Sequence, residues 1–519
     1  MDRAQENWLR YGLFGILLAQ SFVYGLRLRD GFYDGNQHLS WSTPFYLMKG
    51  QEMHQVPFWT KGVAGFVSKS VPTANGRLPV EWYASHPQLL AIPIYLWTGL
   101  FGYDEWVGRS LPILATFLTT ILLWLGVRER HDARLATIFA GAWAALPAVV
   151  VYGRSLEHEP LVMLFASLAL LAHEKFAAGG ARWRWAWFAA LIVMMWSDWS
   201  GFVFAGVLFA AQVGLSLWHR PTRRLALLTA LSIVAALVIV LTQLILTKTP
   251  PPAGVAAPAG IVTNVGMGVG SLWNQYYNRS GLAGGAPWGY WRLKQALYWS
   301  TNFGSIIGLL GLLAGLASLL AVGGRDLQDN GLSVRAILFL IAFGNLIYAV
   351  IVREATAVHL FYQYYYGAFV AWGLAEIVEW VRRAAIRAGR PPALALVAWA
   401  AMLATLSVGA VRTLYTREWS GPGEVALLKL MKTYPPESTA VMIASPEDNY
   451  LANPSGEYYT GQRIWMAYPE DAVMKDLVLL APGDLDSQQA ALNMLAAPKS
   501  KFQLRACSTL LCLWVRTKA

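Results

Sequence analysis

The sequence predicts a mainly α-helical polytopic membrane bundle with a small α/β domain at its C-terminal end. Of 519 residues, 56% are hydrophobic and only 14% are charged, whereas soluble domains carry about 25% charged residues. Several uncharged runs approach the roughly 20 residues that cross a bilayer. Lys and Arg gather between alternate runs, as expected of cytoplasmic loops. The net charge of +11 therefore indicates membrane topology, and we expect no nucleic-acid partner.

The first apolar run, residues 11–26, predicts a retained membrane anchor because no small-residue cleavage site follows it. Residues 27–106 are expected to form the first extracytoplasmic loop. Within this loop, residues 89–100 are apolar but too short to span, which suits a helix lying at the membrane interface. Membrane lipids are therefore expected to contact both segments.

The rest of the bundle is expected to bring the total to about eleven spans. Arg-rich loops after alternate spans place the N-terminus inside and the C-terminus outside. Residues 247–300 form a long, Gly/Pro/Ala-rich extracytoplasmic loop between two of the spans. The expected spans are 107–127, 135–151, 161–176, two short spans within 185–217 that turn at Asp198, 225–246, 306–322, 336–351, 362–381 and 393–411.

The membrane module is expected to end near residue 411, and residues 412–519 form a soluble extracytoplasmic domain. Residues 424–432 suit a helix, and 439–443, 477–480, 502–506 and 511–515 suit strands. Cys507 and Cys512 would flank the turn of a hairpin. A disulfide is expected there only if this end faces an oxidising compartment.

The polar residues that suggest function all fall on the outer side of this topology. Ionisable groups near a membrane are expensive and are often functional. Their convergence predicts one outward-facing polar site centred on Asp34. Its expected members are Asp30, Asp34, His86, Glu157, Glu159, Asp198, Arg353, His359, Tyr362 and Tyr365.

Asp34 and Glu159 are the predicted catalytic pair. Two acids facing one cavity can hold a divalent cation such as Mg or Mn, or one can orient a hydroxyl that the other deprotonates. Ordinary structural explanations remain open for both. Asp34 lies in an Asp/Gly-containing loop, and Glu159 before Pro160 is a favourable helix start.

The other site residues suit a lipid-linked sugar phosphate. Arg353 and His359 could bind the phosphate, His86 could face it, and Asp198 between two Trp residues suits contact with a sugar. Each has a structural alternative: an Arg353–Glu354 pair, an interfacial His86, or a simple turn at Asp198. The tyrosines at 362 and 365 could equally belong to an aromatic belt at the interface.

Three sequence features together resemble a known enzyme family. They are Asp34 after the first span, His86-Pro87-Gln88-Leu89-Leu90, and the run 100–112 with Phe101-Gly102, Arg109 and Pro112. These features resemble the opening of the GT-C membrane glycosyltransferases of the family 39/83 type, over roughly residues 1–204. The family usually has Lys-Pro-Pro where this chain has His86-Pro87-Gln88, and an Asp where it has Glu159.

The resemblance implies an inverting sugar transfer from a polyprenyl-phosphate donor to an acceptor hydroxyl at the outer face of a bacterial inner membrane. The acceptor could be a lipid, a glycan or a protein. In this scheme Asp34 activates the acceptor, Glu159 supports the acceptor or the metal, and Arg353 and His359 stabilise the departing phosphate. The competing class is a transporter or flippase of a polar lipid. The clustering of the acids at one face and the lack of repeated halves favour the enzyme.

Overall fold

A computed structural model of the chain provides the structure. Asp34, most of the predicted loop 247–300 and much of the tail lie outside its described residues. The structure describes residues 3–30, 39–54, 66–68, 72–73, 76–77, 81–83, 86–217, 220–247, 276–277, 279–282, 287–330, 332–417, 422–434, 440–443, 464–466, 477–480, 489, 492–493, 495–497, 501–507 and 512–516.

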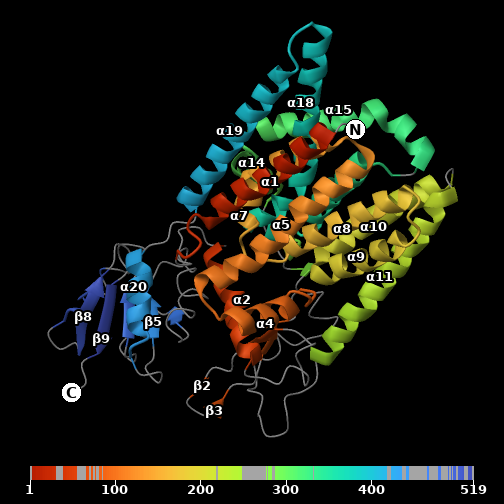
Figure 1. Ribbon diagram of the computed structural model, residues 1–519. Coiled ribbons are helices and arrows are strands. Elements are labelled where there is room, and N and C mark those ends of the chain that lie inside the picture. The colour runs from red at the N-terminus through yellow and green to blue at the C-terminus, as the bar shows by residue number, and fades with distance from the viewer. Residues whose placement is uncertain are drawn as a thin grey trace.

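A bundle of long helices forms most of the molecule (Figure 1). Among the described residues, 6 helices are long and apolar enough to cross a membrane, or up to 7 if one bent pair is a single span. The chain is therefore a multi-pass membrane protein. The helices of the bundle are α1 (Arg3–Gly25), α5 (Glu105–Arg130), α6 (Ala133–Ala145), α7 (Pro147–Tyr152), α8 (Glu159–Ala177), α9 (Trp183–Ser197), α10 (Trp199–Ser216), α11 (Arg220–Thr247), α15 (Ile306–Asn330), α16 (Val334–Ile351), α18 (Gly367–Arg387) and α19 (Ala393–Arg417).

Two local sequence signals set the breaks that matter for the site. Leu146 is extended and Pro147 begins α7, because proline cannot continue a helix but suits its first turn. Asp198 is also extended, with φ −164° and ψ 163°, and its side chain accepts a hydrogen bond from the Ser200 amide. This is an N-cap, and it ends α9 and starts α10 at the predicted turn.

The structure corrects two predicted boundaries. The end of the predicted loop 247–300 contains a helix, α14 (Trp288–Phe303), which meets α15 at 94°. A left-handed Gly304 (φ 70°) closes α14. The predicted span 362–381 begins with a 3₁₀ helix, η2 (Leu360–Tyr366), which follows the short α17 (Arg353–Val358). α14 mixes apolar and polar residues and η2 is largely aromatic, so hydropathy alone did not separate α14 from a loop or η2 from a span.

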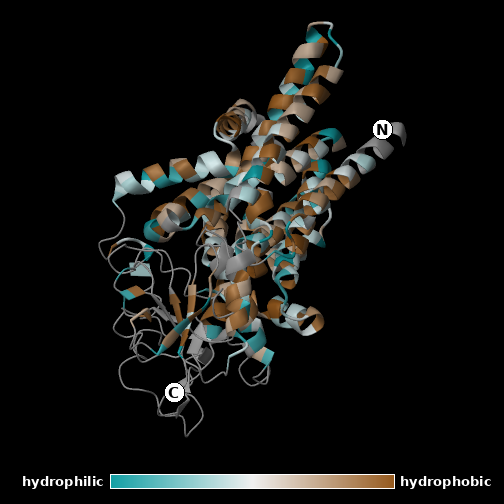
Figure 2. Cartoon of the chain, turned by 90° about the vertical axis from the view of Figure 1, so that its left-hand side faces the viewer, coloured by the Kyte–Doolittle hydropathy of each residue, from teal (hydrophilic) through white to brown (hydrophobic). Residues whose placement is uncertain are grey.

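Close backbone packing joins α15 to α18. A Cβ atom added to Gly373 would lie 1.7 Å from the carbonyl oxygen of Gly311. Small residues at such a crossing let membrane helices approach through van der Waals contact. Figure 2 shows that the long helices carry mostly hydrophobic residues, with hydrophilic residues near the turns.

Smaller elements gather at one end of the bundle, opposite the N-terminus (Figure 1). They include α2 (Leu39–His54) and α4 (Ala91–Phe101), which forms where the short interfacial helix was predicted. Two short antiparallel hairpins belong to the same loop. They pair β1 (Phe66–Ser68) with β4 (Glu81–Tyr83) and β2 (Pro72–Thr73) with β3 (Gly76–Arg77).

The tail combines one helix, α20 (Pro422–Met431), with a five-stranded sheet of order β6-β5-β7-β9-β8. β5 runs parallel to β6 and β7, whereas β9 runs antiparallel to β7 and β8. A disulfide joins Cys507 to Cys512 across the last hairpin. Within the tail, β6 is the described strand that the sequence did not predict, and β1–β4 of the first loop were not predicted either. The strands are β5 (Ala440–Ile443), β6 (Ile464–Met466), β7 (Leu477–Leu480), β8 (Phe502–Cys507) and β9 (Cys512–Arg516).

The tail packs against the elements at its end of the bundle. Leu428 and Met431 of α20 lie in the same buried apolar cluster as Leu47 of α2 and Ile94 of α4. Lys429 also approaches Glu105, the first residue of α5, with 3.4 Å between Nζ and Oε1. The tail is therefore joined to the membrane module by apolar and charged contacts.

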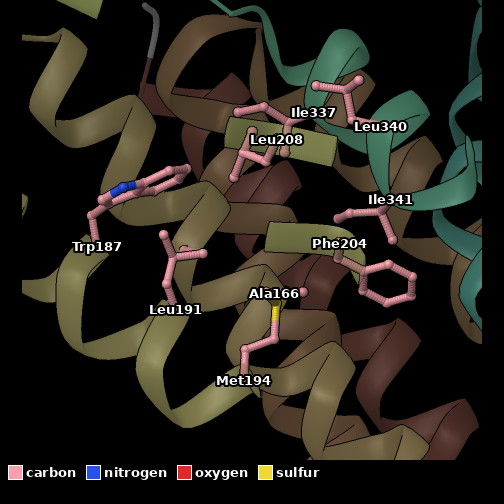
Figure 3. Close-up of a pocket in the computed structure, with 10 residues that line it drawn as sticks. Ala166, Trp187, Leu191, Met194, Phe204, Leu208, Ile337, Leu340 and Ile341 are labelled. Carbon is pink, nitrogen blue, oxygen red and sulfur yellow. The ribbon is translucent and has the colours of Figure 1, made fainter. Parts of the chain in front are cut away.

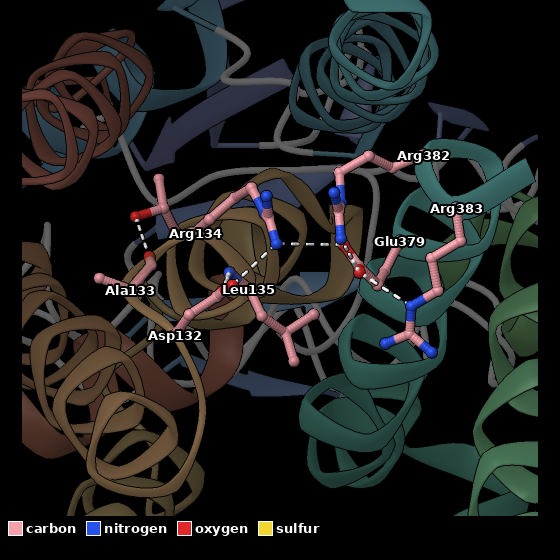
Figure 4. A network of polar contacts seen from close by, with 8 residues as sticks. Asp132, Ala133, Arg134, Leu135, Glu379, Arg382 and Arg383 are labelled. Atoms are coloured by element: carbon pink, nitrogen blue, oxygen red, sulfur yellow. Dashed lines mark hydrogen bonds and ion pairs between the residues drawn. The ribbon is translucent and has the colours of Figure 1, made fainter. Parts of the chain in front are cut away.

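A charged network joins the start of α6 to the last turns of α18 (Figure 4). The Glu379 carboxylate accepts two hydrogen bonds from Arg382, at 2.8 and 2.6 Å, and one from Arg383 at 2.9 Å. Arg134 of α6 approaches the same carboxylate at 3.6 Å. Because Glu379 is buried and these arginines are partly exposed, the network ties α6 to α18 and leaves positive charge on the surface.

Candidate functional site

A buried polar cluster lies where four segments meet at the α4 end of the bundle. The segments are the connector between α7 and α8, the turn between α9 and α10, residues 86–90, and residues 279–282. The Leu89 amide donates to the carbonyl oxygen of Trp196 over 3.3 Å, which fixes the 86–90 segment against the end of α9. The buried polar members include Arg154, Ser155, Glu157, His158, Glu159, Asp198 and Ser200.

His86 and Asp198 form the central pair of this cluster. Nδ1 of His86 lies 2.8 Å from Oδ1 of Asp198, and Nη1 of Arg279 lies 3.3 Å from Nε2 on the other side of the ring. The other Asp198 oxygen accepts from the Ser200 hydroxyl over 2.8 Å. Hydrogen bonding to His86 holds the pKa of Asp198 well below its usual range despite burial, so Asp198 is an anion.

His158 packs against His86 and is held in the neutral form. The two rings stack with 4.7 Å between their centroids. Nδ1 of His158 donates to the Ser197 carbonyl oxygen over 2.7 Å, and Nε2 lies 2.9 Å from the Tyr46 hydroxyl. Burial, followed by the charge of the neighbouring His86, lowers the pKa of His158 to about 3. At neutral pH its Nε2 therefore accepts from Tyr46.

The two glutamates of the connector are buried in the same region. Burial raises the pKa of Glu157 to about 8, against a smaller lowering effect of a hydrogen bond with Ser42. Glu159 begins α8, and its Oε2 atom is buried with no hydrogen-bond partner among the residues that the structure describes. A buried acceptor without a donor is costly, so Glu159 is suited to receive a substrate hydroxyl or a cation.

Tyr365 extends the cluster towards the membrane core. Its hydroxyl lies 2.9 Å from the Ser200 hydroxyl, which itself donates to Asp198, so Tyr365 donates to Ser200. The Tyr365 ring packs edge-on against Phe204, with 4.9 Å between centroids. Phe204 lines an apolar pocket between α8, α9, α10 and α16 (Figure 3), together with Ala166, Trp187 and Leu191. The lining surface of the pocket is apolar.

Arg353, His359 and Tyr362 lie on the α17–η2 side of the site. The Arg353 guanidinium stacks on Trp288, 4.4 Å from its ring centroid. A Cβ on Gly281, whose φ is +77°, would lie 2.9 Å from Arg353 Nη2. Arg353 therefore lies directly beside the segment that carries Arg279. His359 stacks on Phe361, and Tyr362 packs against both of these rings.

Asp30 belongs to a separate group of contacts at the end of α1. Its carboxylate pairs with Arg27, and its carbonyl oxygen accepts from Arg109 Nη1 over 2.6 Å. Arg109 also binds the Leu28 carbonyl oxygen at 3.1 Å. The buried Arg154 reaches the carbonyl oxygens of Leu26 and Arg27. These two arginines thus hold the backbone that leads towards Asp34, which itself lies outside the described residues.

Comparisons with known proteins show what the chain is similar to. Residues 85–246 match the family model of dolichyl-phosphate-mannose-protein mannosyltransferases, and this range contains His86, Glu157, Glu159 and Asp198. The fold is similar to that of ArnT from Cupriavidus metallidurans in the apo state, at 14% identity, 98% coverage of both chains and a TM-score of 0.59. The chain therefore shares the ArnT fold over nearly its whole length.

Further solved structures share this fold. The same ArnT bound to undecaprenyl phosphate aligns at 13% identity over 98% of both chains, with a TM-score of 0.58. The oligosaccharyltransferase AglB from Archaeoglobus fulgidus, in complex with an inhibitory peptide and a dolichol-phosphate, aligns at 13% identity. The alignment covers 91% of this chain and 69% of the AglB chain, with a TM-score of 0.54. A complex of an oligosaccharyltransferase from the same archaeon with Zn and sulfate aligns at 14% identity, covering 97% and 73%, with a TM-score of 0.51. A search of curated protein sequences found no match.

The structure adds three residues to the candidate site: Arg279, His158 and Tyr46. The sequence analysis predicted no role for Arg279. It predicted roles for Glu157 and Glu159 but not for His158 between them. Tyr46 lies in the predicted first loop, where no span or motif marked it. A basic residue in a predicted outer loop was the available signal for Arg279.

A metal site is not assembled by the described residues alone. Within that part of the chain, no group of three or more His, Cys, Asp or Glu side chains gathers so that it could hold a metal ion. The unpartnered oxygen of Glu159 fits one bond to a hard cation, but a carboxylate site needs further oxygen ligands.

Proposed function

We propose that this GT-C enzyme transfers a sugar from a polyprenyl-phosphate donor to an acceptor hydroxyl at the outer membrane face, with inversion at the anomeric carbon. The observation that carries the proposal is the placement of His86 and Arg279, 3.3 Å apart, in a buried cluster that also contains two glutamates. A phosphate needs cationic donors, which the cluster offers. An attacking hydroxyl needs a carboxylate, which Asp34 would supply beside Glu159.

The donor phosphate is bound by Arg279 and His86, with Arg353 beside them. Arg353 approaches the Gly281 backbone, so the two arginines flank one short segment and can both face an anion. His359 follows α17, the short helix that Arg353 begins, and would add a further donor. These groups stabilise the charge that develops on the leaving phosphate. The undecaprenyl phosphate in ArnT and the dolichol-phosphate in AglB support a polyprenyl carrier.

The acceptor is activated by Asp34, with Glu159 supporting the acceptor hydroxyl or a shared divalent cation such as Mg or Mn. Glu159 is available for this role because Oε2 has no hydrogen-bond partner within the described chain. Asp30 helps to place Asp34 through its backbone contact with Arg109. Glu157, Tyr362 and Tyr365 shape the sugar subsite, while Asp198 orients His86 and so has a different role from the sugar contact expected at first.

The outer face is assigned from the two ends of α5 and α8. The cluster lies at the first residue of α8, and the tail meets the first residue of α5. At the opposite ends, Arg130 pairs with Glu174 and Lys175 with Glu129, near the positive surface around Arg382. Positive loops face the cytoplasm. These contacts support an extracytoplasmic position of the site and of the residue 412–519 domain, at a bacterial inner membrane.

Turnover of lipid donors tests the proposal. Purified protein would be incubated with radiolabelled polyprenyl-phosphate sugars and candidate acceptors, with and without EDTA. We expect release of free polyprenyl phosphate from the wild type and loss of release in Asp34→Asn at unchanged protein yield. Loss of activity in EDTA would support the cation. No release from any donor, together with donor movement across liposomes, would replace the enzyme with the competing transporter hypothesis.

A further inference from the structure

We infer that His86 and Asp198 form an acid–base pair that delivers one proton to the departing donor phosphate; this rests on the proposed transfer. The contacts of the pair define its direction. Asp198 is buried and accepts from His86 Nδ1 at 2.8 Å and from the Ser200 hydroxyl at 2.8 Å and amide at 3.2 Å. With Nδ1–H committed to Asp198, Nε2 is the ring atom that gains and loses a proton.

The surroundings of His86 hold the ring in a fixed orientation. The carbonyl oxygen of His86 accepts from Gln88 Nε2 over 2.7 Å, and the next turn of chain is bonded to the end of α9 through Leu89. The His158 ring stacks against it on one side. Nε2 is thereby directed towards Arg279. Since a guanidinium only donates, Nε2 accepts from Arg279 in this structure and the ring is neutral.

A bound phosphate would end the hydrogen bond from Arg279 to Nε2, because its oxygens compete for the Arg279 guanidinium. Arg279 then donates to a phosphate oxygen, and Nε2 can take a proton and donate to a second oxygen. The described charged or titratable groups around His86 are Asp198 on the α9–α10 turn, Arg279 on the 279–282 segment, and His158 and Glu157 on the α7–α8 connector. Burial and Arg279 lower the pKa of His86, whereas Asp198 raises it. A bound phosphate adds negative charge beside Nε2 and so favours the imidazolium form of His86.

The transfer step balances with this assignment. The acceptor oxygen forms a bond to the anomeric carbon while the bond from that carbon to the phosphate oxygen breaks, and its electron pair stays on the phosphate. Asp34 takes the acceptor proton. The phosphodiester monoanion would become a dianion, whose second pKa is about 6. The His86 imidazolium transfers its Nε2 proton to a phosphate oxygen and becomes neutral. Exchange with solvent then returns a proton to His86 and removes one from Asp34.

A lysine at position 86 provides the sharpest comparison. An ordinary lysine has a pKa of about 10.4, so it would bind the phosphate as a permanent cation without taking up a proton near neutral pH. A glutamine would offer a hydrogen bond but no proton. The two variants His86→Lys and His86→Gln therefore keep phosphate contacts of different kinds while removing the titration. His54→Gln is the matched control, because His54 is an exposed histidine on α2 outside the cluster.

The experiment counts protons on binding of undecaprenyl phosphate by calorimetry, in buffers of different ionisation enthalpy between pH 6 and 8.5. Protonation of the ligand itself is common to all variants and cancels. We expect the wild type and His54→Gln to take up close to one proton more than His86→Lys or His86→Gln. This extra proton makes binding more sensitive to pH. Above the pKa of His86 in the free enzyme, the Kd of the wild type and of His54→Gln should rise with each pH unit by up to about tenfold more than the Kd of the two His86 variants. Asp198→Asn should lose most of the extra uptake.

Turnover distinguishes this inference from the proposed function. With a phosphodiester donor, kcat of the wild type should fall on the alkaline side, while His86→Lys should keep its lower rate to higher pH. Equal proton uptake and equal kcat profiles in the wild type and His86→Lys would overturn the acid–base pair while leaving the transferase intact. An inactive wild type on every donor would instead overturn the transferase itself.

Discussion

The Arg154 side chain donates a hydrogen bond from Nη1 to the carbonyl oxygen of Leu26 over 2.8 Å, and Nη2 reaches the carbonyl oxygen of Arg27 over 3.0 Å. These carbonyls directly follow the last residue of α1, and Arg27 there has a left-handed backbone with φ 55°. Such a conformation costs about 1–2 kcal/mol for a residue with a side chain. The hydrogen bond from Arg27 to the Leu414 carbonyl oxygen and its contact with the Tyr415 ring offset this conformational cost.

Replacement of Arg154 by Met should therefore destabilise the protein. The change leaves two carbonyls at the end of α1 without their donor, and we expect the free energy of unfolding to fall by about 2–4 kcal/mol. The free energy of unfolding should fall less in Arg154→Lys, because lysine can still donate a hydrogen bond to one of the carbonyls. Thermal unfolding in detergent would measure both, with Arg182→Met, at an exposed position, as the control. Equal melting of Arg154→Met and the control would refute the role.

Gly373→Ala should disrupt the α15–α18 crossing. The new methyl group would meet the Gly311 carbonyl at 1.7 Å, so the helices must separate, and we expect a loss of about 1–3 kcal/mol. Gly206→Ala is the matched control, since nothing lies within 4 Å of its added Cβ. That change in α10 should be neutral or stabilising by up to about 1 kcal/mol. Chemical unfolding in mixed micelles would compare the stabilities of the two variants. A Gly206→Ala protein less stable than Gly373→Ala would contradict the close packing.

The pH dependence of stability should change in Glu157→Gln. Burial raises the pKa of Glu157 from 4.5 to about 8, so the folded state binds a proton that the unfolded state has released between these values. The stability that Glu157 contributes is complete below pH 4.5 and is lost as pH rises through 8. The melting temperature of Glu157→Gln relative to wild type should therefore rise from pH 5 to pH 8 and then level off. A constant difference across this range would show that Glu157 is ionised in the folded protein.

The Cys507–Cys512 disulfide gives a direct test of topology, because the sequence contains only these 2 cysteines. If the tail is outside, the bridge forms in cells and both thiols resist maleimide labelling until they are reduced. After mild reduction, a membrane-impermeant maleimide should label them in spheroplasts without lysis. Labelling that requires lysis, or free thiols in unreduced cells, would place the tail in the cytoplasm. The double Ser variant gives the background signal.

Long apolar helices were the easiest part of the structure to predict from the sequence. The turn at Asp198 was also evident, because an N-capping residue interrupts a single apolar stretch. The helix α14 and the 3₁₀ helix η2 were missed, since mixed polar and aromatic composition gives them a hydropathy between that of a span and that of a loop. In the site, the grouping of Glu159 with other polar residues was expected because they precede or separate apolar runs on the same predicted side. The pairing of His86 with Asp198 and Arg279 depends on contacts between segments more than 100 residues apart, which local patterns do not contain.

The joint apolar cluster of the tail with α2 and α4 has a consequence for biosynthesis. Leu47 and Ile94 are made early by the ribosome, yet Leu428 and Met431 that complete their cluster are made only after all the membrane helices. During translation this apolar surface stays uncovered until roughly the final fifth of the polypeptide has been made. A chain that ends before α20 would then leave the surface exposed, which favours aggregation or proteolysis.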